Sequence, residues 1–285
     1  MEYQEKHITY KGQPVFIKLS MPSFDRTLKQ YVENEACFMF VNKGEVAVRT
    51  PDDYFKVNRQ QGMLAKCLNY FFEPVKDSKH CDDGIESVGI FLYPSIVKDL
   101  FEFDFTQSTH KVDYNVKQIQ IDKLLENYRE SINLLLENPS LADESLIKAK
   151  LKEFILLVSK STEAPNELDF LSAIFKPTEV AFKKVIQQNL YTNLSVDELA
   201  SLTQMSTSSF KRKFKEVFEE SPKKYINTKK IEKAVELLQN TNDRVSDVAY
   251  DVGYDSLATF NRNFTDLVGK SPSDFRLDQN EKSLS

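Results

Sequence analysis

The sequence contains one short motif twice, and this repeat constrains the fold more than any other feature. Phe210-x-Arg212-x-Phe214, followed by Ser221-Pro222, returns fifty residues later as Phe260-x-Arg262-x-Phe264, followed by Ser271-Pro272. Further upstream the matching positions are forty-nine residues apart, which indicates one extra residue in the turn before the second motif. The repeat therefore predicts a small helical unit that is present twice in tandem.

Each copy predicts two short helices joined by a tight turn. In the first copy Ser195 and Glu198 form a capping box, which is typical of the start of a helix. In the second copy Gly253 stands where the turn needs a left-handed backbone, and Asp255 or Ser256 follows as the N-cap. This is the helix-turn-helix arrangement, which places its second helix in the major groove of DNA.

The second helix of each copy has one apolar and one polar face. Phenylalanines four positions apart predict a stripe that packs inside the unit, so the opposite face remains exposed. Arg can bind guanine through two hydrogen bonds, Asn can do the same with adenine, and Ala and Thr can contact a thymine methyl group. The candidate base-contacting residues are Ser208, Lys211, Arg212 and Lys215 in the first copy and Ala258, Thr259, Asn261 and Arg262 in the second.

After Ser221-Pro222, a helical run to Leu238 connects the two copies. Its roughly sixteen residues span ~24 Å, which suits two DNA-reading helices about one DNA turn, ~34 Å, apart. The chain has a net charge of −5, but Lys211 to Lys230 contains eight Lys or Arg and three acids. Such a local basic surface is what phosphate contact requires. The candidate phosphate-contacting residues are Lys213, Lys223, Lys224, Lys229 and Lys230.

The segment from about Glu179 to Arg276 resembles the DNA-binding domain of the AraC/XylS family of transcription regulators. The matching features are both Phe-x-Arg-x-Phe motifs, Leu199-Ala200, Met205-Ser206, Ser221-Pro222-x-x-Tyr225, Ala234 with Leu237-Leu238, Val248-Ala249, Gly253-Tyr254 and Ser271-Pro272-x-x-Phe275. The resemblance implies binding of double-stranded promoter DNA, usually with activation through RNA polymerase. It carries the base-contacting role over to all the candidates named above except Lys215. The chain departs from the family at Lys230, or Lys229 beside it, where Arg is usual, and Lys cannot form a two-pronged phosphate contact.

The first half of the chain predicts a small β-sandwich or barrel. From Gln13 to about Tyr93, short apolar or alternating runs are separated by turn signals such as Asn42-Lys43-Gly44. Together with the family resemblance, this region is similar to a cupin-type sensory barrel. The expected fold class is therefore α+β: a cupin-like small β-barrel with a helical hairpin, then an all-α domain of two helix-turn-helix units joined by a linker helix.

Aromatic residues of the first half could line a cavity for an apolar ligand. They are Phe38, Phe40, Tyr54, Phe55, Tyr70, Phe71, Phe72, Phe91 and Tyr93. A filled barrel core is the favoured interpretation, because small barrels are normally packed with side chains. The sequence leaves open a regulator that senses a small-molecule effector and one that is controlled by a protein partner.

The residue types that usually bind metals or catalyse reactions do not occur here in the patterns that those functions require. His7, His80 and His110 are not at ligand spacing, so we expect no metal site. The sequence has no catalytic triad pattern and no glycine-rich phosphate loop. We therefore expect neither a cofactor nor enzymatic activity. The alternative is a cupin enzyme fused to a DNA-binding domain. Cys67 or the pair His80-Cys81 could sense redox state, although unreactive thiols are the expected state. Without a signal segment or a membrane-spanning run, a cytoplasmic protein is expected.

We expect three segments along the chain. Residues 1–112 form the sensory domain, residues 113–166 the helical hairpin and hinge, and residues 167–285 the DNA-binding domain. The periodicity turns helical from about Lys117, with more apolar surface than a small barrel needs. In the family such helices commonly form a dimer contact, so we expect a homodimer, with packing inside the chain as the alternative. The expected dimer residues are Leu151, Phe154, Ile155 and Val158.

Overall fold

The chain divides into two compact units, Met1–Glu179 and Val180–Ser285, and each is described by itself. The computed structural model describes residues 3–30, 35–66, 68–75, 84–101, 108, 110–162, 165–176 and 180–283, without the side chains of 279–283. The candidate redox residues Cys67, His80 and Cys81 lie outside these residues. The division confirms the expected α+β class, since the first unit contains two β-sheets and the second is helical.

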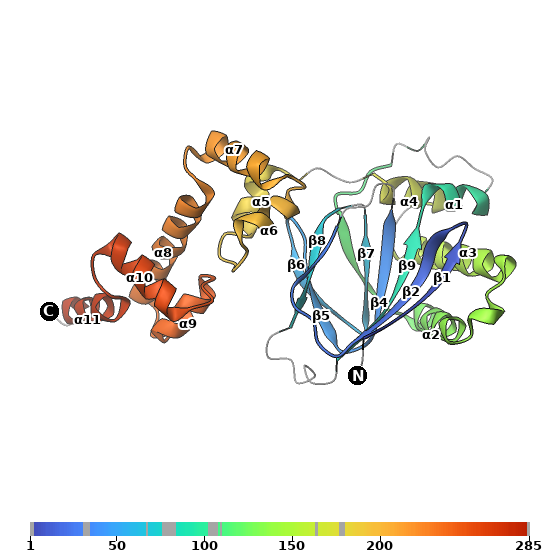
Figure 1. The fold of residues 1–285 in the computed structure, drawn as a ribbon, viewed down its shortest axis with the longest axis horizontal. Helices are drawn as coiled ribbons and strands as arrows, with labels where there is room; N and C mark the ends of the chain where they lie inside the picture. Colours follow the sequence, from blue (N-terminus) through green and yellow to red (C-terminus); the bar gives the residue numbers. More distant parts are fainter. Residues whose placement is uncertain are drawn as a thin grey trace. The chain divides into compact units, whose positions relative to one another are not determined.

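The strands of the first unit form two antiparallel sheets within the described residues (Figure 1). The six-stranded sheet has the order β1-β2-β9-β4-β7-β10, and the four-stranded sheet has the order β3-β8-β5-β6. The strands are β1 (Gln4–Tyr10), β2 (Gln13–Met21), β3 (Thr27–Lys29), β4 (Ala36–Lys43), β5 (Glu45–Arg49), β6 (Tyr54–Asn58), β7 (Gln61–Ala65), β8 (Tyr70–Pro74), β9 (Ile85–Leu92) and β10 (Val116–Gln120). The sheets face each other, because one apolar core takes residues from both.

Strand β4 shows why this sequence folds as layers. Its alternating side chains contribute to different cores: Cys37, Met39 and Val41 lie between the two sheets, whereas Phe38 and Phe40 lie under the helices. A strand that is covered on both faces reads as one continuous apolar run rather than as an alternating pattern. The six-stranded sheet is therefore the middle layer of the unit, between the second sheet and the helices.

Four α-helices and one 3₁₀ turn accompany the sheets among the described residues. They are α1 (Pro94–Leu100), α2 (Lys123–Glu137), η3 (Pro139–Leu141), α3 (Glu144–Ser161) and α4 (Glu167–Ile174). The expected hairpin is formed by α2 and α3, whose N-caps Asp122 and Asp143 accept backbone hydrogen bonds. The helical segment begins later than expected, because residues 116–120 pair with β7 as a strand.

The prediction that four residues of α3 form a dimer contact is wrong. Leu151, Phe154, Ile155 and Val158 are all fully buried within their own chain, in the core that the helices share with the six-stranded sheet. The ring of Phe154 lies 5.3 Å from that of Phe38 and 5.6 Å from that of Tyr128. The outer face of β4 supplies the apolar partner that the sequence did not reveal.

The boundary between the units lies at residue 180 rather than at residue 167. The expected DNA-binding domain, residues 167–285, included the segment of α4, but Phe170, Leu171 and Ile174 of this helix belong to the core of the first unit. Ser172 Oγ and Lys176 Nζ both donate hydrogen bonds to the Ser108 carbonyl oxygen, at 3.1 and 2.9 Å. Helix α4 is thus part of the first unit.

The second unit consists of helices throughout its described residues (Figure 1). They are α5 (Phe182–Gln188), α6 (Val196–Leu202), α7 (Thr207–Phe218), α8 (Pro222–Asn240), α9 (Val245–Asp251), α10 (Leu257–Val268) and α11 (Pro272–Ser283). The two predicted helix-turn-helix copies are α6 with α7 and α9 with α10. Helix α8 joins them, with α7 near one of its ends and α9 and α10 near the other (Figure 1).

Candidate nucleic-acid interface

Local hydrogen bonds fix the start of α6 and the turn between α6 and α7 in the first copy. Ser195 Oγ accepts from the backbone N of Glu198 at 3.2 Å, and Glu198 Oε2 accepts from the backbone N of Ser195 at 2.7 Å, which confirms the capping box. Gln204 has a φ of 54° in the turn, and the Met205 backbone N donates to the Ala200 carbonyl at 2.9 Å. These contacts fix the angle at which α7 leaves α6.

An aromatic cluster fixes the rotation of α7 about its own axis. Phe210 and Phe214 are fully buried, and Phe182 from α5 lies 5.5 and 6.2 Å from their rings. Tyr225 on α8 packs on Phe214 at 5.6 Å. With this face of α7 packed, its opposite face is held toward solvent. Phe182 did not stand out in the sequence, because α5 has only seven residues, too few for its three apolar positions to give a clear periodic signal.

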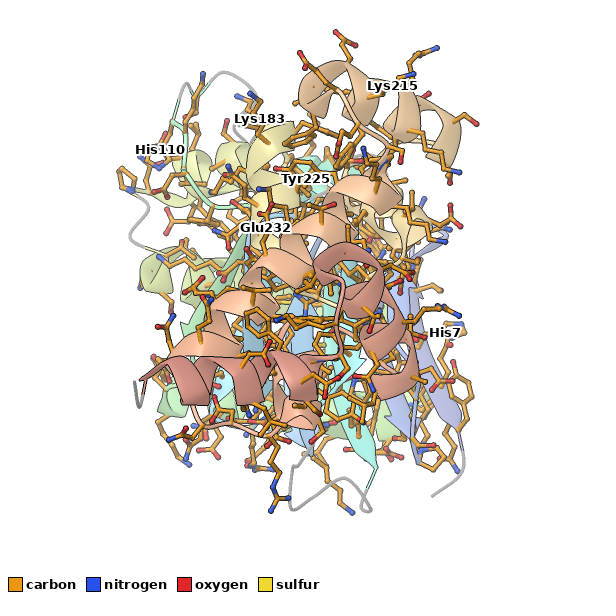
Figure 2. The ribbon with its side chains drawn as sticks, turned by 90° about the vertical axis from the view of Figure 1, so that its left-hand side faces the viewer. His7, His110, Lys183, Lys215, Tyr225 and Glu232 are labelled. Atoms are coloured by element: carbon orange, nitrogen blue, oxygen red, sulfur yellow. The ribbon has the colours of Figure 1, made fainter. Side chains whose placement is uncertain are left out.

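The exposed face of α7 carries all four base-contacting candidates of the first copy. Ser208, Lys211, Arg212 and Lys215 are exposed, and Lys215 is labelled on this helix in Figure 2. None of the three cations has an ion-pair partner among the residues that the structure describes. Their positive charges are therefore not neutralised by the protein, and all three can meet an anionic surface.

Four of the five phosphate-contact candidates are accessible. Lys213 and Lys223 are exposed. Lys224 Nζ lies 2.9 Å from Glu220 Oε1, and Lys229 Nζ lies 2.6 Å from Glu232 Oε2. Glu232 is labelled on α8 in Figure 2. Exposed pairs of this kind are weak, so a phosphate can displace the carboxylate.

The prediction that Lys230 contacts a phosphate is wrong. This side chain is 8% exposed, and its Nζ donates to the Thr192 carbonyl oxygen at 2.5 Å and to the Gly253 carbonyl oxygen at 2.8 Å. Burial lowers the pKa of Lys230 to about 8. The amine points into the protein, because two backbone segments leave their carbonyl oxygens in its path.

The second copy repeats this geometry with less charge. Phe260 and Phe264 are fully buried and make edge-to-face contacts with Tyr254 and Phe275, respectively, so the opposite face of α10 is exposed. Ser256 is the N-cap, while Asp255 accepts a hydrogen bond from Asn193 Nδ2 at 2.7 Å. Ala258, Asn261 and Arg262 are exposed, and Thr259 is half-buried. All the base-contacting candidates therefore lie on the exposed side of α7 or α10.

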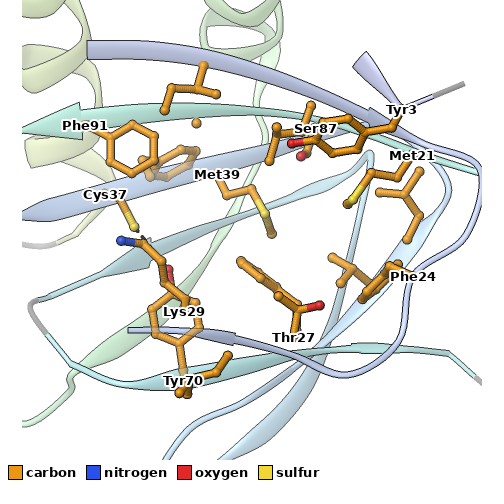
Figure 3. Close-up of a pocket in the computed structure, with 18 residues that line it drawn as sticks. Tyr3, Met21, Phe24, Thr27, Lys29, Cys37, Met39, Tyr70, Ser87 and Phe91 are labelled. Carbon is orange, nitrogen blue, oxygen red and sulfur yellow. Dashed lines mark hydrogen bonds between the residues drawn. The ribbon is translucent and has the colours of Figure 1, made fainter. Parts of the chain in front are cut away.

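A cavity of about 470 Å³ lies between the two sheets of the first unit (Figure 3). Of the aromatic candidates it is lined by Phe38, Tyr70, Phe72 and Phe91, so the filled-core interpretation is wrong. The sequence did not single out the lining residues of β2 and its following segment, among them Ile17, Leu19, Met21 and Phe24. Burial raises the pKa of Tyr70 well above its ordinary value, so the phenol is neutral.

Few polar side chains line this cavity, and three of them have a partner at one side. Lys29 Nζ lies 2.6 Å from Glu35 Oε1, and Cys37 Sγ lies 3.3 Å from the Tyr70 hydroxyl. Lys29, Cys37 and Tyr70 lie at one side of the cavity, and Met21 and Phe24 at the other (Figure 3). Ser87 and Tyr3 lie toward the side of Met21 (Figure 3), so the cavity offers a mostly apolar volume with polar groups at both sides.

No group of three or more His, Cys, Asp or Glu suited to a metal ion occurs in the described part of the chain. His7 and His110 lie far apart in the first unit (Figure 2). His80 lies outside the described residues. No helix that the structure describes is both long and apolar enough to span a membrane.

Two family models match the chain, one on each unit. A model described as the ExsA N-terminal regulatory domain matches residues 36–170, and one described as a helix-turn-helix domain matches residues 199–278. The second match contains both copies of the repeated motif. The N-terminal match includes strands of both sheets and helices α1 to α3.

Curated relatives share part of the chain. The virulence regulon transcriptional activator VirF of Yersinia enterocolitica is 26% identical over 132 residues, which are 46% of this chain and 49% of that protein. The XylDLEGF operon transcriptional activator of Pseudomonas putida is 32% identical over 107 residues, which are 35% of this chain and 33% of that protein. The chain therefore spans about half the length, or less, of the curated relatives it matches. Among solved structures, unsaturated fatty acid-bound ToxT of Vibrio cholerae aligns with 92% of this chain and 95% of its own at 14% identity and a TM-score of 0.39.

Proposed function

Because the chain belongs to the AraC/XylS family of transcription regulators, we propose that it is a sequence-specific DNA-binding protein that activates transcription. The observation that carries this proposal is the exposed face of α7, on which Lys211, Arg212 and Lys215 have no ion-pair partner among the described residues. The names of both relatives above support activation. RNA polymerase and a second copy of the chain remain predicted partners, and the protein would act in the cytoplasm, without enzymatic activity.

In this proposal each helix-turn-helix copy inserts its second helix into one major groove. Arg212 on α7 and Arg262 on α10 can each bind guanine through two hydrogen bonds, and Asn261 can bind adenine in the same way. The 19 residues of α8 span ~28 Å, which suits contact with successive major grooves on one face of the duplex. Lys213 and Lys223 would neutralise the flanking phosphates.

Selection from a random duplex library with the full chain tests this function. We expect enrichment of a site with two parts whose centres lie about 10 base pairs apart. The double variant Lys211→Ala/Arg212→Ala, which removes two exposed side chains and no buried contact, should lose enrichment of the first part. If the wild-type chain enriches no sequence at low salt, or if the double variant enriches the same site, the proposed role of α7 is wrong.

We further propose that the cavity between the sheets binds a small apolar effector. Its volume of about 470 Å³ lies within the range of small-molecule sites, and the surrounding side chains are mostly apolar. This cavity favours a small molecule over control by a protein partner alone. Because Lys29 is already paired with Glu35, the site does not by itself demand a charged ligand.

Calorimetric titration with oleyl alcohol and with oleic acid distinguishes the two chemistries. The two probes have the same chain, and they differ in the charge of the head group. Binding of both supports an apolar site, whereas binding of oleic acid alone would show that Lys29 exchanges Glu35 for the ligand carboxylate. If neither probe binds and no other apolar molecule of this size does, control by a protein partner becomes the better interpretation.

A further inference from the structure

Helix α8 packs on both helix-turn-helix copies, but with different parts of its length. Tyr225 near its start belongs to the aromatic cluster of the first copy, with its ring 4.6 Å from that of Phe218. Ile231, Ala234 and Leu238 belong to the core of the second copy. A single helix between two small cores fixes their separation, but contacts between the copies are needed to fix their relative rotation.

The second copy contacts, through its backbone, the segment that leads into the first copy. Gly253, in the turn between α9 and α10, has a φ of 86°. A Cβ atom at this position would lie 2.5 Å from the Thr192 carbonyl oxygen and 2.7 Å from the Tyr191 carbonyl oxygen, both in the segment that precedes α6. Those distances are shorter than any side chain tolerates, so this close approach requires glycine for sterics as well as for backbone conformation.

Lys230 joins the same two segments from the middle of α8. Its ammonium group donates to the carbonyl oxygens of Thr192 and Gly253, and its Nζ lies 5.4 Å from the ring centroid of Tyr254. Two carbonyl oxygens that converge in a buried space repel each other unless a donor lies between them. The hydrogen bond from Asn193 to Asp255 adds a second link at the surface.

We propose that Lys230 is a positioning residue that locks the second DNA-reading helix to the first, so that α7 and α10 meet the duplex at one spacing and one orientation. We call the contact of Lys230, Thr192 and Gly253 the joint. The role of the joint in DNA recognition rests on the proposed DNA-binding function, whereas its rigidity does not. A locked pair loses less freedom on binding, so the second groove contact strengthens the first.

A distance measurement without DNA tests the rigidity. Spin labels at Glu216 on α7 and Asp266 on α10, both exposed and equivalent in the repeat, report the separation of the two helices. The labels are attached to introduced cysteines after Cys37, Cys67 and Cys81 are replaced by alanine. We expect a narrow distance distribution in this background and a clearly broader one with Lys230→Met, which keeps the length but removes the donors. Lys230→Arg, which restores charge and donors, should be narrow again.

A binding measurement tests the consequence for recognition. The probes are the two-part duplex selected by the wild-type chain, the same duplex with its second part scrambled, and one with about 5 extra base pairs, half a turn, between the parts. The wild-type chain should bind both altered duplexes about 100-fold more weakly or worse. Lys230→Met should bind the three within about 10-fold of one another, because its second helix contributes little.

A glycine pair controls for general destabilisation. Gly269 has a φ of 85°, close to that of Gly253, but a Cβ there would meet nothing within 4 Å. Gly253→Ala and Gly269→Ala therefore share the backbone strain, and only the former disturbs the joint. Gly253→Ala should broaden the distance distribution and weaken the second-site contribution, and Gly269→Ala should do neither.

The outcomes separate the joint from the proposed function. If no site is selected from the library, the proposed DNA-binding function is wrong, and the distance measurement still tests whether the joint is rigid. A second outcome is that a two-part site is selected, but Lys230→Met still gives a narrow distance distribution and still binds the altered duplexes about 100-fold more weakly. In that case the joint is not what positions α10. Should Lys230→Met fail to fold, the glycine pair decides, and equal behaviour of its two variants would overturn the proposal.

Discussion

Arg212 on α7 and Lys223 in the first turn of α8 are both exposed cations, but we expect different contributions from them. Arg212→Ala should lower affinity for the selected site by about 1–3 kcal/mol and relax the preference at one or two base pairs, because a two-pronged base contact carries specificity. Titration of the selected duplex and of single-base variants measures both effects. Equal loss on selected and random DNA would assign Arg212 to a phosphate instead.

Lys223 lies in the first turn of α8, outside both DNA-reading helices, so the proposed arrangement gives it a phosphate contact and no base contact. Lys223→Ala should weaken binding to all sequences alike and reduce the slope of log affinity against log salt by about one. Lys224→Ala is the matched comparison. Because Lys224 is partly neutralised by Glu220 at 2.9 Å, this variant should lose less affinity. An unchanged salt slope in Lys223→Ala would remove this residue from the interface.

Lys230 predicts a pH dependence of stability. Its pKa in the folded chain is lowered to about 8 from an ordinary value of 10.5, so between these values the unfolded chain binds more protons than the folded one. Stability therefore rises with pH through this window. Relative to Lys230→Arg, which does not titrate there, the wild-type free energy of unfolding should rise by about 1–3 kcal/mol between pH 7.5 and pH 10. Parallel urea titrations of both proteins measure the difference, and parallel curves would contradict the burial of the amine.

The helices were predictable from the sequence because their signals are local. The capping box at Ser195 and Glu198, the left-handed Gly253 and the phenylalanine stripes each lie within a few residues of the structure they determine. Strand β10 was misread as the start of a helix, because its partner β7 lies about fifty residues upstream. Pairing over such a distance leaves no periodic trace in the strand itself.

The cavity and the joint could not be read from the sequence for a related reason. A cavity depends on how side chains of two sheets fail to fill the space between them, and Phe72 and Met39 look the same in a filled core. Lys230 follows Lys229 and looks like an ordinary exposed cation. Only the approach of Thr192 and Gly253, which lie on either side of α8 in the chain, shows that it is buried.

Helix α3 provides a test of the corrected interpretation of its apolar stripe. Ile155 is fully buried against the six-stranded sheet, whereas the neighbouring Leu156 is 37% exposed. Ile155→Glu places an unpaired charge in the core and should destabilise the first unit by at least about 4 kcal/mol. Leu156→Glu should change stability by less than about 0.5 kcal/mol. Thermal unfolding measures the stability of both variants, and light scattering measures their oligomeric state. If the wild type is dimeric and Ile155→Glu is a folded monomer, α3 is a dimer contact after all.

At the scale of the whole molecule, two units with separate cores divide the proposed tasks of sensing and DNA binding. The cavity belongs to the first unit, and every base-contacting candidate belongs to the second. If a ligand in the cavity controls DNA binding, it must do so through a change that it makes in the first unit. A ligand that binds only the folded first unit stabilises it by about 2.7 kcal/mol at a concentration one hundred times its Kd.

This division predicts which part of the molecule an effector stabilises. With oleyl alcohol or oleic acid as the probe, calorimetric unfolding should show a shift to higher temperature in the transition of the first unit and no shift in that of the second. Ser87 lines the cavity, so Ser87→Phe should fill part of it and abolish the shift, while Ser87→Ala, which adds no volume, should retain it. Both variants should bind DNA like the wild type without the probe, because Ser87 lies in the unit that does not carry the reading helices. A ligand-induced shift that survives Ser87→Phe would place the ligand elsewhere, and a shift in both transitions would show that the units unfold as one.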